Sequence, residues 1–456
     1  MNRTLAPLAA LFLASCMAAT PSLQRAAPPG ATRSFATQAP ASVEPVPDDW
    51  WRLYDDPALD RLVEASLAAN ADLRVAYANL DGARAALRQA RAARLPQAGL
   101  ESGLTVDGTR AQPSANAVPS TDWDIAATAS WDVDLFGRLR AAAHAARADA
   151  AALEAARDSV RVAVVADTVL AYVDFCGANH AIAVARDVAR AQETLVHQIQ
   201  AQFDAGEISP LEVSQAAALA AQSRAAIPLL DAQRANALFR LATLQGRPAG
   251  NAGQLAPSCT SVPRLRGIAP IGDGKALLRR RPDIREAEHK LAAVTARIGV
   301  ARADLYPRVN IGGAFGLLTG VFNATATPLV SWSFPTGPAR AKIEQARAAE
   351  RGALANWDMA VLKALREVET ALAYYDAEMR RSHDLGIAAD ESRAYVRRVA
   401  ARVRLGAAAG LLQTDAERSL ATARLQQAQA ELSVAQAQVT LFRALGGGWR
   451  TSVTPR

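Results

Sequence analysis

Aromatic side chains, lysine and cysteine are all scarce in this chain of 456 residues. Aromatic residues make up 5% of the sequence, four of the 51 basic residues are lysine, and there are three cysteines. The sequence also lacks an uninterrupted apolar stretch of the roughly 18 residues that a membrane-spanning helix needs. The net charge of +7 comes from dispersed arginines rather than from a basic stripe interleaved with aromatics, which argues against nucleic acid as a partner.

Long helices account for most of what is present. Half of the residues are hydrophobic, which excludes a disordered chain, and alanine, leucine, arginine and glutamate dominate long stretches. Residues 137–203 contain no proline and would extend for roughly 100 Å as one helix. After a turn, a second helix is expected back to about residue 245. The pattern recurs later, so the sequence predicts two long helical hairpins, at 137–247 and 339–446.

The N-terminus has the pattern of an export signal. A basic start, Met1-Asn2-Arg3, precedes a short apolar run that ends in Leu13-Ala14-Ser15-Cys16. This run is too short to span a membrane, so residues 1–15 are predicted to be a signal peptide. The ending resembles the lipobox of bacterial lipoproteins, which implies a lipid on Cys16. An ordinary secretory signal with an incidental cysteine is the alternative. Residues 16–47 are predicted to form an extended tether.

The remaining cysteines are Cys176 and Cys259, and an exported chain meets an oxidising compartment. Two alternatives stay open, a disulfide between them or two buried thiols. The five histidines are scattered without the spacing of metal ligands, and no acid–base pair or activated nucleophile is recognisable. The sequence therefore predicts no metal, no cofactor besides the lipid, no catalytic residue and no enzyme.

The chain repeats itself at an interval of about two hundred residues. The segment 91–96 matches 302–307, and Ser130-Trp131 matches Ser331-Trp332. Two copies indicate a duplicated unit rather than a solenoid. The predicted boundaries place the first repeat at 48–256, the second at 257–449 and a C-terminal tail at 450–456.

Each repeat holds a predicted β-hairpin, at 97–135 and 307–334. Between Trp123 and Leu135 apolar and polar residues alternate strictly, whereas the last strand, at 327–334, has a weaker pattern. Such strands fit a membrane β-barrel or a soluble sheet with one wet face. Because four strands cannot close a barrel in lipid, the membrane alternative requires several copies of the chain. A dimer would supply eight strands and a trimer twelve.

Four motifs resemble those of the TolC-like outer-membrane efflux factors, in the lipoprotein (NodT) branch that serves resistance–nodulation–division multidrug pumps. They are the strand-to-helix segment 130–140, then 277–285 and 296–307, and the closing Leu-Phe-Arg-Ala-Leu-Gly-Gly-Gly-Trp at 441–449. The resemblance covers almost the whole chain after Cys16.

This resemblance implies a mainly α fold with a membrane β-barrel. Three copies would form a twelve-stranded barrel in the bacterial outer membrane, continued by a twelve-helix α-barrel in the periplasm. The lipid-anchored trimer would passively export small amphipathic compounds, received from an inner-membrane pump through a periplasmic adaptor (membrane fusion) protein. Two alternatives remain, the exit duct of a type I protein-secretion system and a non-conducting periplasmic scaffold lipoprotein.

The resemblance also implies functional positions at the turns of the two helical hairpins. Leu411 and Asp415 match the family's periplasmic gate, where three carboxylates would form a ring that selects cations. The alternative is a solvated helix face. The matching residue of the first repeat is the uncharged Gln215. The expected adaptor contacts are Gly206, Glu207, Ile208 and Ser209 at the first turn and Gly406, Ala407 and Ala408 at the second.

Overall fold

The computed structural model describes most of the chain after its N-terminal segment. The described residues are 35–37, 41–42, 44–107, 120–267, 269–318, 321–332, 337–405, 407 and 410–448. The predicted signal peptide and C-terminal tail lie outside them. The described residues divide into two compact units that cut across the two sequence repeats. Unit 1 comprises 78–155 and 285–360, and unit 2 comprises the described residues of 27–77, 156–284 and 361–456.

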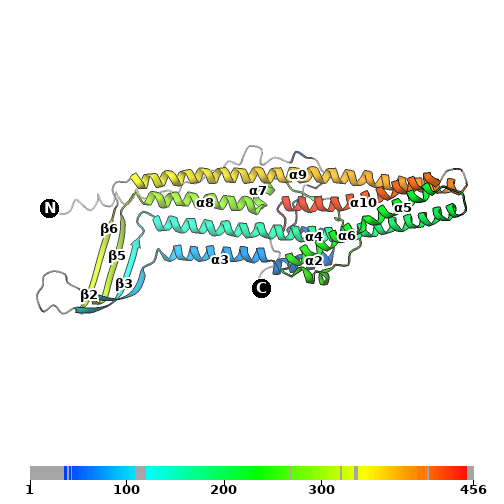
Figure 1. Ribbon diagram of the computed structural model, residues 1–456. Coiled ribbons are helices and arrows are strands. Elements are labelled where there is room, and N and C mark those ends of the chain that lie inside the picture. Colours follow the sequence, from blue (N-terminus) through cyan, green and yellow to red (C-terminus); the bar gives the residue numbers. More distant parts are fainter. Residues whose placement is uncertain are drawn as a thin grey trace. The chain divides into compact units, whose positions relative to one another are not determined.

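Unit 1 contains a four-stranded sheet (Figure 1). Every neighbouring pair is antiparallel and the order is β2-β3-β5-β6, so β2 and β6 are the edges. The strands are β2 (Gln97–Asp107), β3 (Ser120–Val133), β5 (Arg308–Leu318) and β6 (Val321–Ser331). Each predicted β-hairpin thus supplies two neighbouring strands.

The pairing register gives the sheet one apolar and one polar face. Leu100, Ala127, Phe315 and Ala324 stand opposite one another across the four strands. One residue earlier along β2, the row runs through Gly99, Thr128, Ala314 and Thr325. Because side chains alternate between faces along a strand, the alternation in the sequence fits this register.

The last strand lies earlier in the chain than the predicted range 327–334. The strand β6 begins at Val321 and ends at Ser331, and residues 333 and 334 lie outside the described residues. The middle of its apolar face consists of Ala324, Ala326 and Pro328, which weakens the hydrophobic pattern. Pro328 is compatible with β6 because an edge strand tolerates a residue that donates no hydrogen bond.

Small residues allow close helix packing in unit 1. The unit 1 portions of α3 (Ala71–Ala92), α4 (Arg138–Asp204), α8 (Pro282–Ala303) and α9 (Gly337–Arg404) lead away from the strands. A Cβ atom on Gly299 of α8 would lie 3.1 Å from the Cβ atom of Ala141 on α4. The same two helices are joined by an ion pair of 2.6 Å between Arg297 and Asp149.

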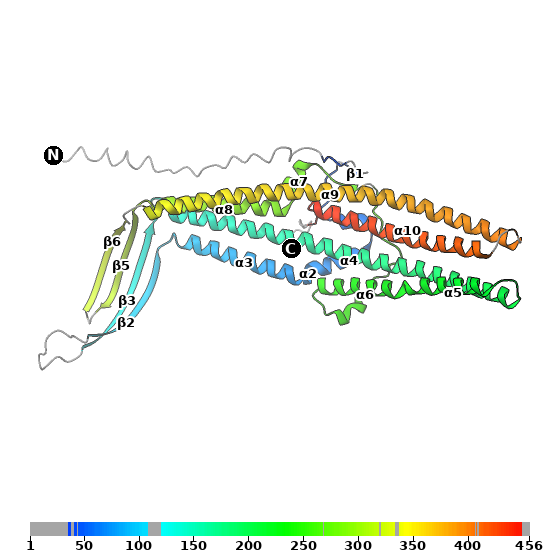
Figure 2. The ribbon, with the colours of Figure 1, turned by 45° about the horizontal axis from the view of Figure 1, so that its top comes forward.

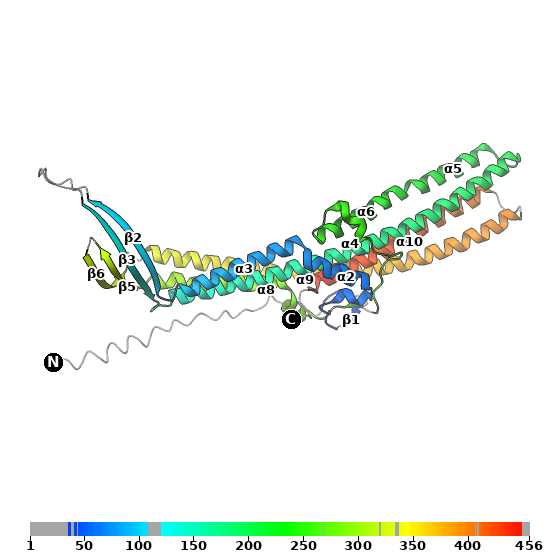
Figure 3. The same cartoon turned by 90° about the horizontal axis from the view of Figure 1, so that it is seen from below.

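Two helical hairpins extend through unit 2, and Figure 2 shows their turns at the same end of that unit. One hairpin pairs α4 with α5 (Pro210–Ala225) and α6 (Ile227–Leu244), and the other pairs α9 with α10 (Gly410–Ala444). Figure 3 shows α5 and α6 following α4 back from the first turn. This return arm was expected to be one helix, but it is interrupted at Ala226. Pro228, in the first turn of α6, explains the break because proline cannot donate to the preceding turn.

The core of unit 2 lies where its shorter elements meet α4 and the end of α10. Trp50 is fully buried and stacks on Phe442 with ring centroids 4.8 Å apart. A Cβ atom on Gly447 would lie 2.6 Å from the Trp50 ring, so glycine is needed for this approach. The shorter elements of this core are η1 (Trp50–Tyr54), α2 (Pro57–Ala69) and α7 (Gly274–Arg280), while η2 (Ala249–Leu255) lies against α6.

The described end of the predicted tether is bound to unit 2. The short strand β1 (Ala41–Ser42) pairs in parallel with β4 (Ala269–Pro270), and Val46 is buried at 5% exposure. The Glu369 carboxylate accepts hydrogen bonds from the backbone amides of Ala36 and Thr37 at 2.7 and 3.0 Å. The prediction of a tether did not anticipate this packing. We refer to the described residues of 35–47 as the N-terminal strap.

None of the helices in the described ranges combines the length and the apolar content that crossing a bilayer would take.

Candidate functional site

The first hairpin turn is shaped by local backbone chemistry. Gly206 has a φ of +76°, the left-handed conformation that ends many helices. The Glu207 amide then donates to the carbonyl of Gln202 at 2.9 Å, which satisfies a carbonyl at the end of α4. At the start of α5, the Ser209 hydroxyl accepts from the Leu211 amide at 3.2 Å. The turn is thus held at both of its ends.

A carboxylate completes the cap of α5. Glu212 accepts from the backbone amide of Ser209 at 3.2 Å and also from its hydroxyl. Ser209 and Glu212 therefore form a capping box, with Pro210 in the first turn of the helix. The Ser209 hydroxyl, and then backbone amides of the turn, hold the pKa of Glu212 below its ordinary value. Glu212 accordingly stays ionised beside the helix N-terminus.

Three of the four expected contact residues at the first turn are exposed. Gly206, Glu207 and Ser209 face solvent, whereas Ile208 is half-buried. Ile208 packs against a small cluster whose buried members are Leu195, Ile199 and Ala216. Ile208 therefore holds the turn against the hairpin, and the exposed three remain available to a partner.

The described residues of the second turn lack the side-chain cap that holds the first turn. The Ala407 amide donates to the carbonyl of Arg402 at 2.8 Å, and the Arg402 guanidinium donates to the carbonyl of Ala407 at 3.4 Å. Ala407 is exposed, and nearby Leu405 is 82% exposed. Two expected contact residues, Gly406 and Ala408, lie outside the described residues, as does the expected lipid site Cys16.

The expected gate residues lie one turn apart near the start of α10. Leu411 is 44% exposed, and the side chain of Asp415 is also 44% exposed. Asp415 makes an ion pair with Arg418 at 3.0 Å. Gln215, the matching position of the first repeat, is half-buried. The structure thus brings Leu411 and Asp415 together on the helix and adds an arginine to them.

Sequence reasoning missed Arg418, although its spacing of three residues from Asp415 was a usable signal. Glu417, two residues beyond Asp415, behaves differently because it is half-buried. Burial raises the pKa of Glu417 above its ordinary value. The gate position therefore holds a carboxylate paired with an arginine, and Glu417 is not part of this pair.

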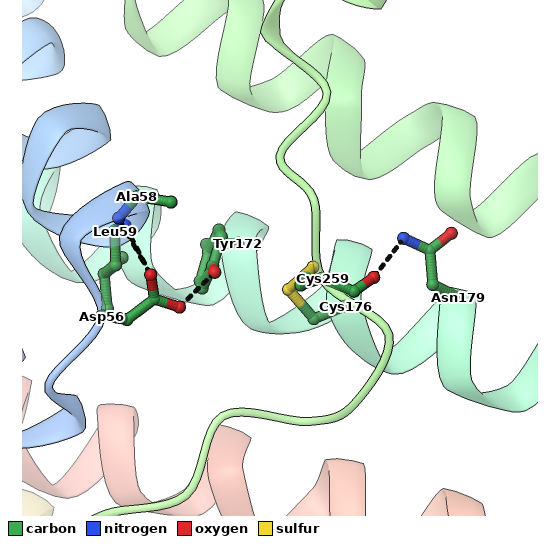
Figure 4. The surroundings of a disulfide bond; sticks show 7 residues. All are labelled: Asp56, Ala58, Leu59, Tyr172, Cys176, Asn179 and Cys259. Carbon is green, nitrogen blue, oxygen red and sulfur yellow. Dashed lines mark hydrogen bonds between the residues drawn. A yellow bond between two sulfur atoms is a disulfide. The ribbon is translucent and has the colours of Figure 1, made fainter.

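Of the two alternatives for the cysteines, the structure contains the disulfide, between Cys176 on α4 and Cys259 (Figure 4). Their Cα atoms are 5.4 Å apart, and Asn179 donates to the carbonyl of Cys259 at 3.1 Å. On the same helix, the Tyr172 hydroxyl donates to Asp56, whose other oxygen caps α2. These contacts fix α4 to two segments that are distant in sequence.

Across the described part of the chain, no group of three or more histidine, cysteine, aspartate or glutamate side chains is arranged to hold a metal ion.

Comparison with known proteins agrees with this architecture. The model of the family described as "Outer membrane efflux protein" matches residues 62–247 and 274–447. The chain belongs to this family. It is 33% identical to the outer membrane protein OprJ of Pseudomonas aeruginosa, over 97% of this chain and 95% of OprJ. It is 30% identical to the pyoverdine export outer membrane protein OpmQ of Pseudomonas putida, over 98% and 97%.

A solved channel structure shares the fold. The outer-membrane channel OprN superposes with a TM-score of 0.86 at 33% identity, covering 94% of this chain and 99% of OprN. The predicted fold class is confirmed by this likeness.

Family membership gives the location and the broad function. The chain is an outer-membrane efflux protein that extends from the bacterial outer membrane into the periplasm. The family and these relatives are outer-membrane efflux proteins or channels rather than enzymes.

Proposed function

We propose that this chain works as a homotrimer, with twelve strands in one outer-membrane barrel and twelve helices in one periplasmic barrel. The observation that carries the proposal is the four-stranded sheet, whose edges β2 and β6 lack a partner among the described residues. Open edges are not tolerated in lipid because each unpaired backbone group costs several kcal/mol. Four strands are also too few, since membrane barrels need about eight.

The strand directions support closure by copies of the same chain. All three pairings are antiparallel, so β2 and β6 run in opposite directions. The β6 strand of one copy can therefore pair antiparallel with the β2 strand of the next. Three copies of four strands give twelve, which leave room for a channel, whereas the eight strands of a dimer would enclose a lumen filled by side chains.

The duct passively exports small amphipathic compounds that an inner-membrane resistance–nodulation–division pump passes to it through a periplasmic adaptor. Support comes from the relative named for pyoverdine export and from the likeness to an outer-membrane channel. A lipid on Cys16, implied by the lipobox, anchors the chain beside its barrel. The adaptor contacts are the exposed turn residues Gly206, Glu207, Ser209 and Ala407, together with Gly406 and Ala408.

Leu411 and Asp415 form the periplasmic gate in this proposal. Three copies would place three Asp415 carboxylates around the pore, a ring that favours cations when it is narrow. Each carboxylate has Arg418 at 3.0 Å, so the net charge of the ring is small. The gate would consequently be only weakly cation-selective in its resting state.

Assembly and conduction test the proposal directly. Mass determination of the detergent-solubilised protein is expected to give three copies, and insertion into a planar bilayer is expected to give discrete conductance steps. A stable monomer would contradict the shared barrel. A trimer that never conducts, even as Asp415→Ala, would favour the scaffold alternative over the duct.

The gate predicts opposite effects from its two charged residues. Asp415→Asn is expected to lower the preference for cations and Arg418→Gln to raise it, because each removes one member of the pair. The measurement is the reversal potential across a salt gradient. Glu417→Gln is the matched control, since it removes a carboxylate two residues away on a different face of α10. Equal reversal potentials for all three variants would place the gate elsewhere.

A further inference from the structure

Two tryptophans mark the level at which the sheet meets the helices of unit 1. The Trp131 indole donates to the carbonyl of Arg94 at 3.1 Å, and the Trp332 indole donates to the carbonyl of Leu305 at 3.1 Å. The two residues are 39% and 51% exposed. Tryptophans of this kind form the aromatic girdles of membrane barrels at the headgroup level. In the proposed barrel, the turn that follows α3, at Arg94, would therefore lie at the periplasmic boundary of the bilayer.

A row of exposed arginines begins at this boundary. Arg84, Arg88 and Arg91 lie at intervals of four and three residues along α3, on one face, and Arg94 follows in the turn. The row from Arg84 to Arg91 rises about 10 Å, and one headgroup layer is roughly 5–8 Å deep. Arg84 has an acidic neighbour, Asp81, at 3.8 Å. Within the described ranges, the other three have no acidic partner.

The shared scaffold does not require arginine at two of these three positions. In the second repeat, the counterparts of Arg88 and Arg94 are Gly299 and Leu305, whereas the counterpart of Arg91 is Arg302. Gly299 lies against α4, so that helix face is packed, whereas the α3 face is exposed. Cations at a helix C-terminus are favoured by the helix dipole, which would account for Arg91 and Arg94. This effect falls off beyond the last turn and does not account for Arg88.

We propose that Arg88, Arg91 and Arg94 bind the phosphate groups of anionic phospholipids in the periplasmic leaflet of the outer membrane. The two tryptophans place these arginines at the depth of the headgroups, and the exposed face of α3 presents their positive charge. The spacing of the arginines along the helix allows two or three headgroups to be contacted together. The inference rests on the proposed barrel in the outer membrane, and not on the cargo, the adaptor or the gate.

The test uses the full-length purified protein and measures the lipid that it retains. The protein is incubated in mild detergent with equal amounts of phosphatidylglycerol and phosphatidylcholine, and the lipids that remain bound are quantified by mass spectrometry. Wild-type protein is expected to enrich phosphatidylglycerol. The triple variant Arg88→Gln/Arg91→Gln/Arg94→Gln is expected to lose about fivefold of this enrichment for each arginine removed.

Two further variants separate charge at this site from general effects. Arg88→Lys/Arg91→Lys/Arg94→Lys keeps the charge and is expected to retain most of the enrichment. About 0.5 M salt should abolish the enrichment by screening. The matched control removes three exposed arginines of α9 in unit 2 and is expected to behave as wild type; it is Arg397→Gln/Arg398→Gln/Arg404→Gln.

Three outcomes would overturn the inference. Unchanged enrichment in the glutamine variant excludes lipid binding by this face. Dissociation of the oligomer with unchanged lipid content would assign the arginines to contacts with a neighbouring copy. Altered ion selectivity with unchanged lipid content would place them in the lumen. Wild-type conductance is recorded from the same preparation, so failure of the duct and failure of lipid binding are scored separately.

Discussion

At the scale of single residues, two largely buried arginines connect parts of unit 2 that are distant in sequence. The Arg281 guanidinium, 8% exposed, pairs with Asp283 and Glu367 at 2.7 Å each and donates to the carbonyl of Ala444 at 2.7 Å. Neighbouring Arg280 donates to the strap and to the carbonyl of Gly446. Isolated buried charges are costly, and these partners are what makes the burial tolerable.

The disulfide leads to a prediction at the same scale. Cys259→Ser opens a covalent loop with a sequence separation of 83 residues, and the entropy of the unfolded chain implies a loss of about 4.5 kcal/mol in the free energy of unfolding. Denaturant unfolding of the purified protein measures the loss. The double variant Cys176→Ala/Cys259→Ala should show a similar loss, which separates the bond from the reactivity of a lone thiol. Wild-type stability in both variants would show that the bond contributes nothing.

At the scale of elements, the two helical hairpins differ more than their sequence similarity suggests. The first has a capped turn and a return arm that is broken at Ala226, and the second has a plain turn and an unbroken α10. Both turns nevertheless use the same backbone bond, from Glu207 to Gln202 and from Ala407 to Arg402. The shared bond sets the shape of the turns, and the side chains set their polarity.

The capping box predicts a local and pH-dependent effect. Ser209→Ala removes a helix cap and is expected to cost about 1 kcal/mol of local stability. Because the pKa of Glu212 is lowered in the folded turn, its contribution is present above the ordinary glutamate pKa and is lost as the pH falls through the lowered value. Hydrogen exchange of residues 206–213 measures both effects. Ser214→Ala, in the interior of α5, should leave exchange unchanged.

The elements were far more predictable from sequence than the connections between them. The alternation from Trp123 to Leu135 and the absence of proline from 137–203 are local signals, and β3 and α4 follow them. Pro228 is an equally local signal for a helix break, which the prediction of one return helix did not use. The packing of the strap could not be predicted, because Ala36 and Glu369 meet across more than three hundred residues. The spacing of Asp415 and Arg418 is, like Pro228, a local signal that the prediction did not use.

At the scale of the whole molecule, the described sheet of unit 1 has unpaired edge strands, whereas the N-terminal strap is held within unit 2. The open edges of this sheet are β2 and β6, which in the proposed trimer pair with neighbouring copies. The strap, in contrast, is held by Glu369, by the β1–β4 pair and by burial of Val46, all within unit 2. A lipid anchor at Cys16 would therefore be joined to unit 2 only by the residues between Cys16 and the strap.

The strap predicts a second dependence on pH. Burial alone would raise the pKa of Glu369, but hydrogen bonds from Ala36 and Thr37 outweigh it and lower the pKa. The attachment of Ala36 and Thr37 to Glu369 should therefore be complete above the ordinary glutamate pKa and should weaken as the pH falls through the lowered value. Glu369→Ala should release the start of the strap at neutral pH, measured as faster hydrogen exchange at 35–37. Glu378→Ala, on the same helix, is the control, and equal exchange in both would contradict the attachment.

The position of the disulfide has a consequence for fragments of the protein. The bond between Cys176 and Cys259 encloses the entire first turn, whereas no disulfide among the described residues encloses the second. A protease that nicks the exposed residues of 206–209 would leave two pieces that migrate together until a reductant is added. A nick near Ala407 would yield two separate bands at once. Non-reducing electrophoresis of a briefly digested sample can thus report which of the two turns a bound protein shields.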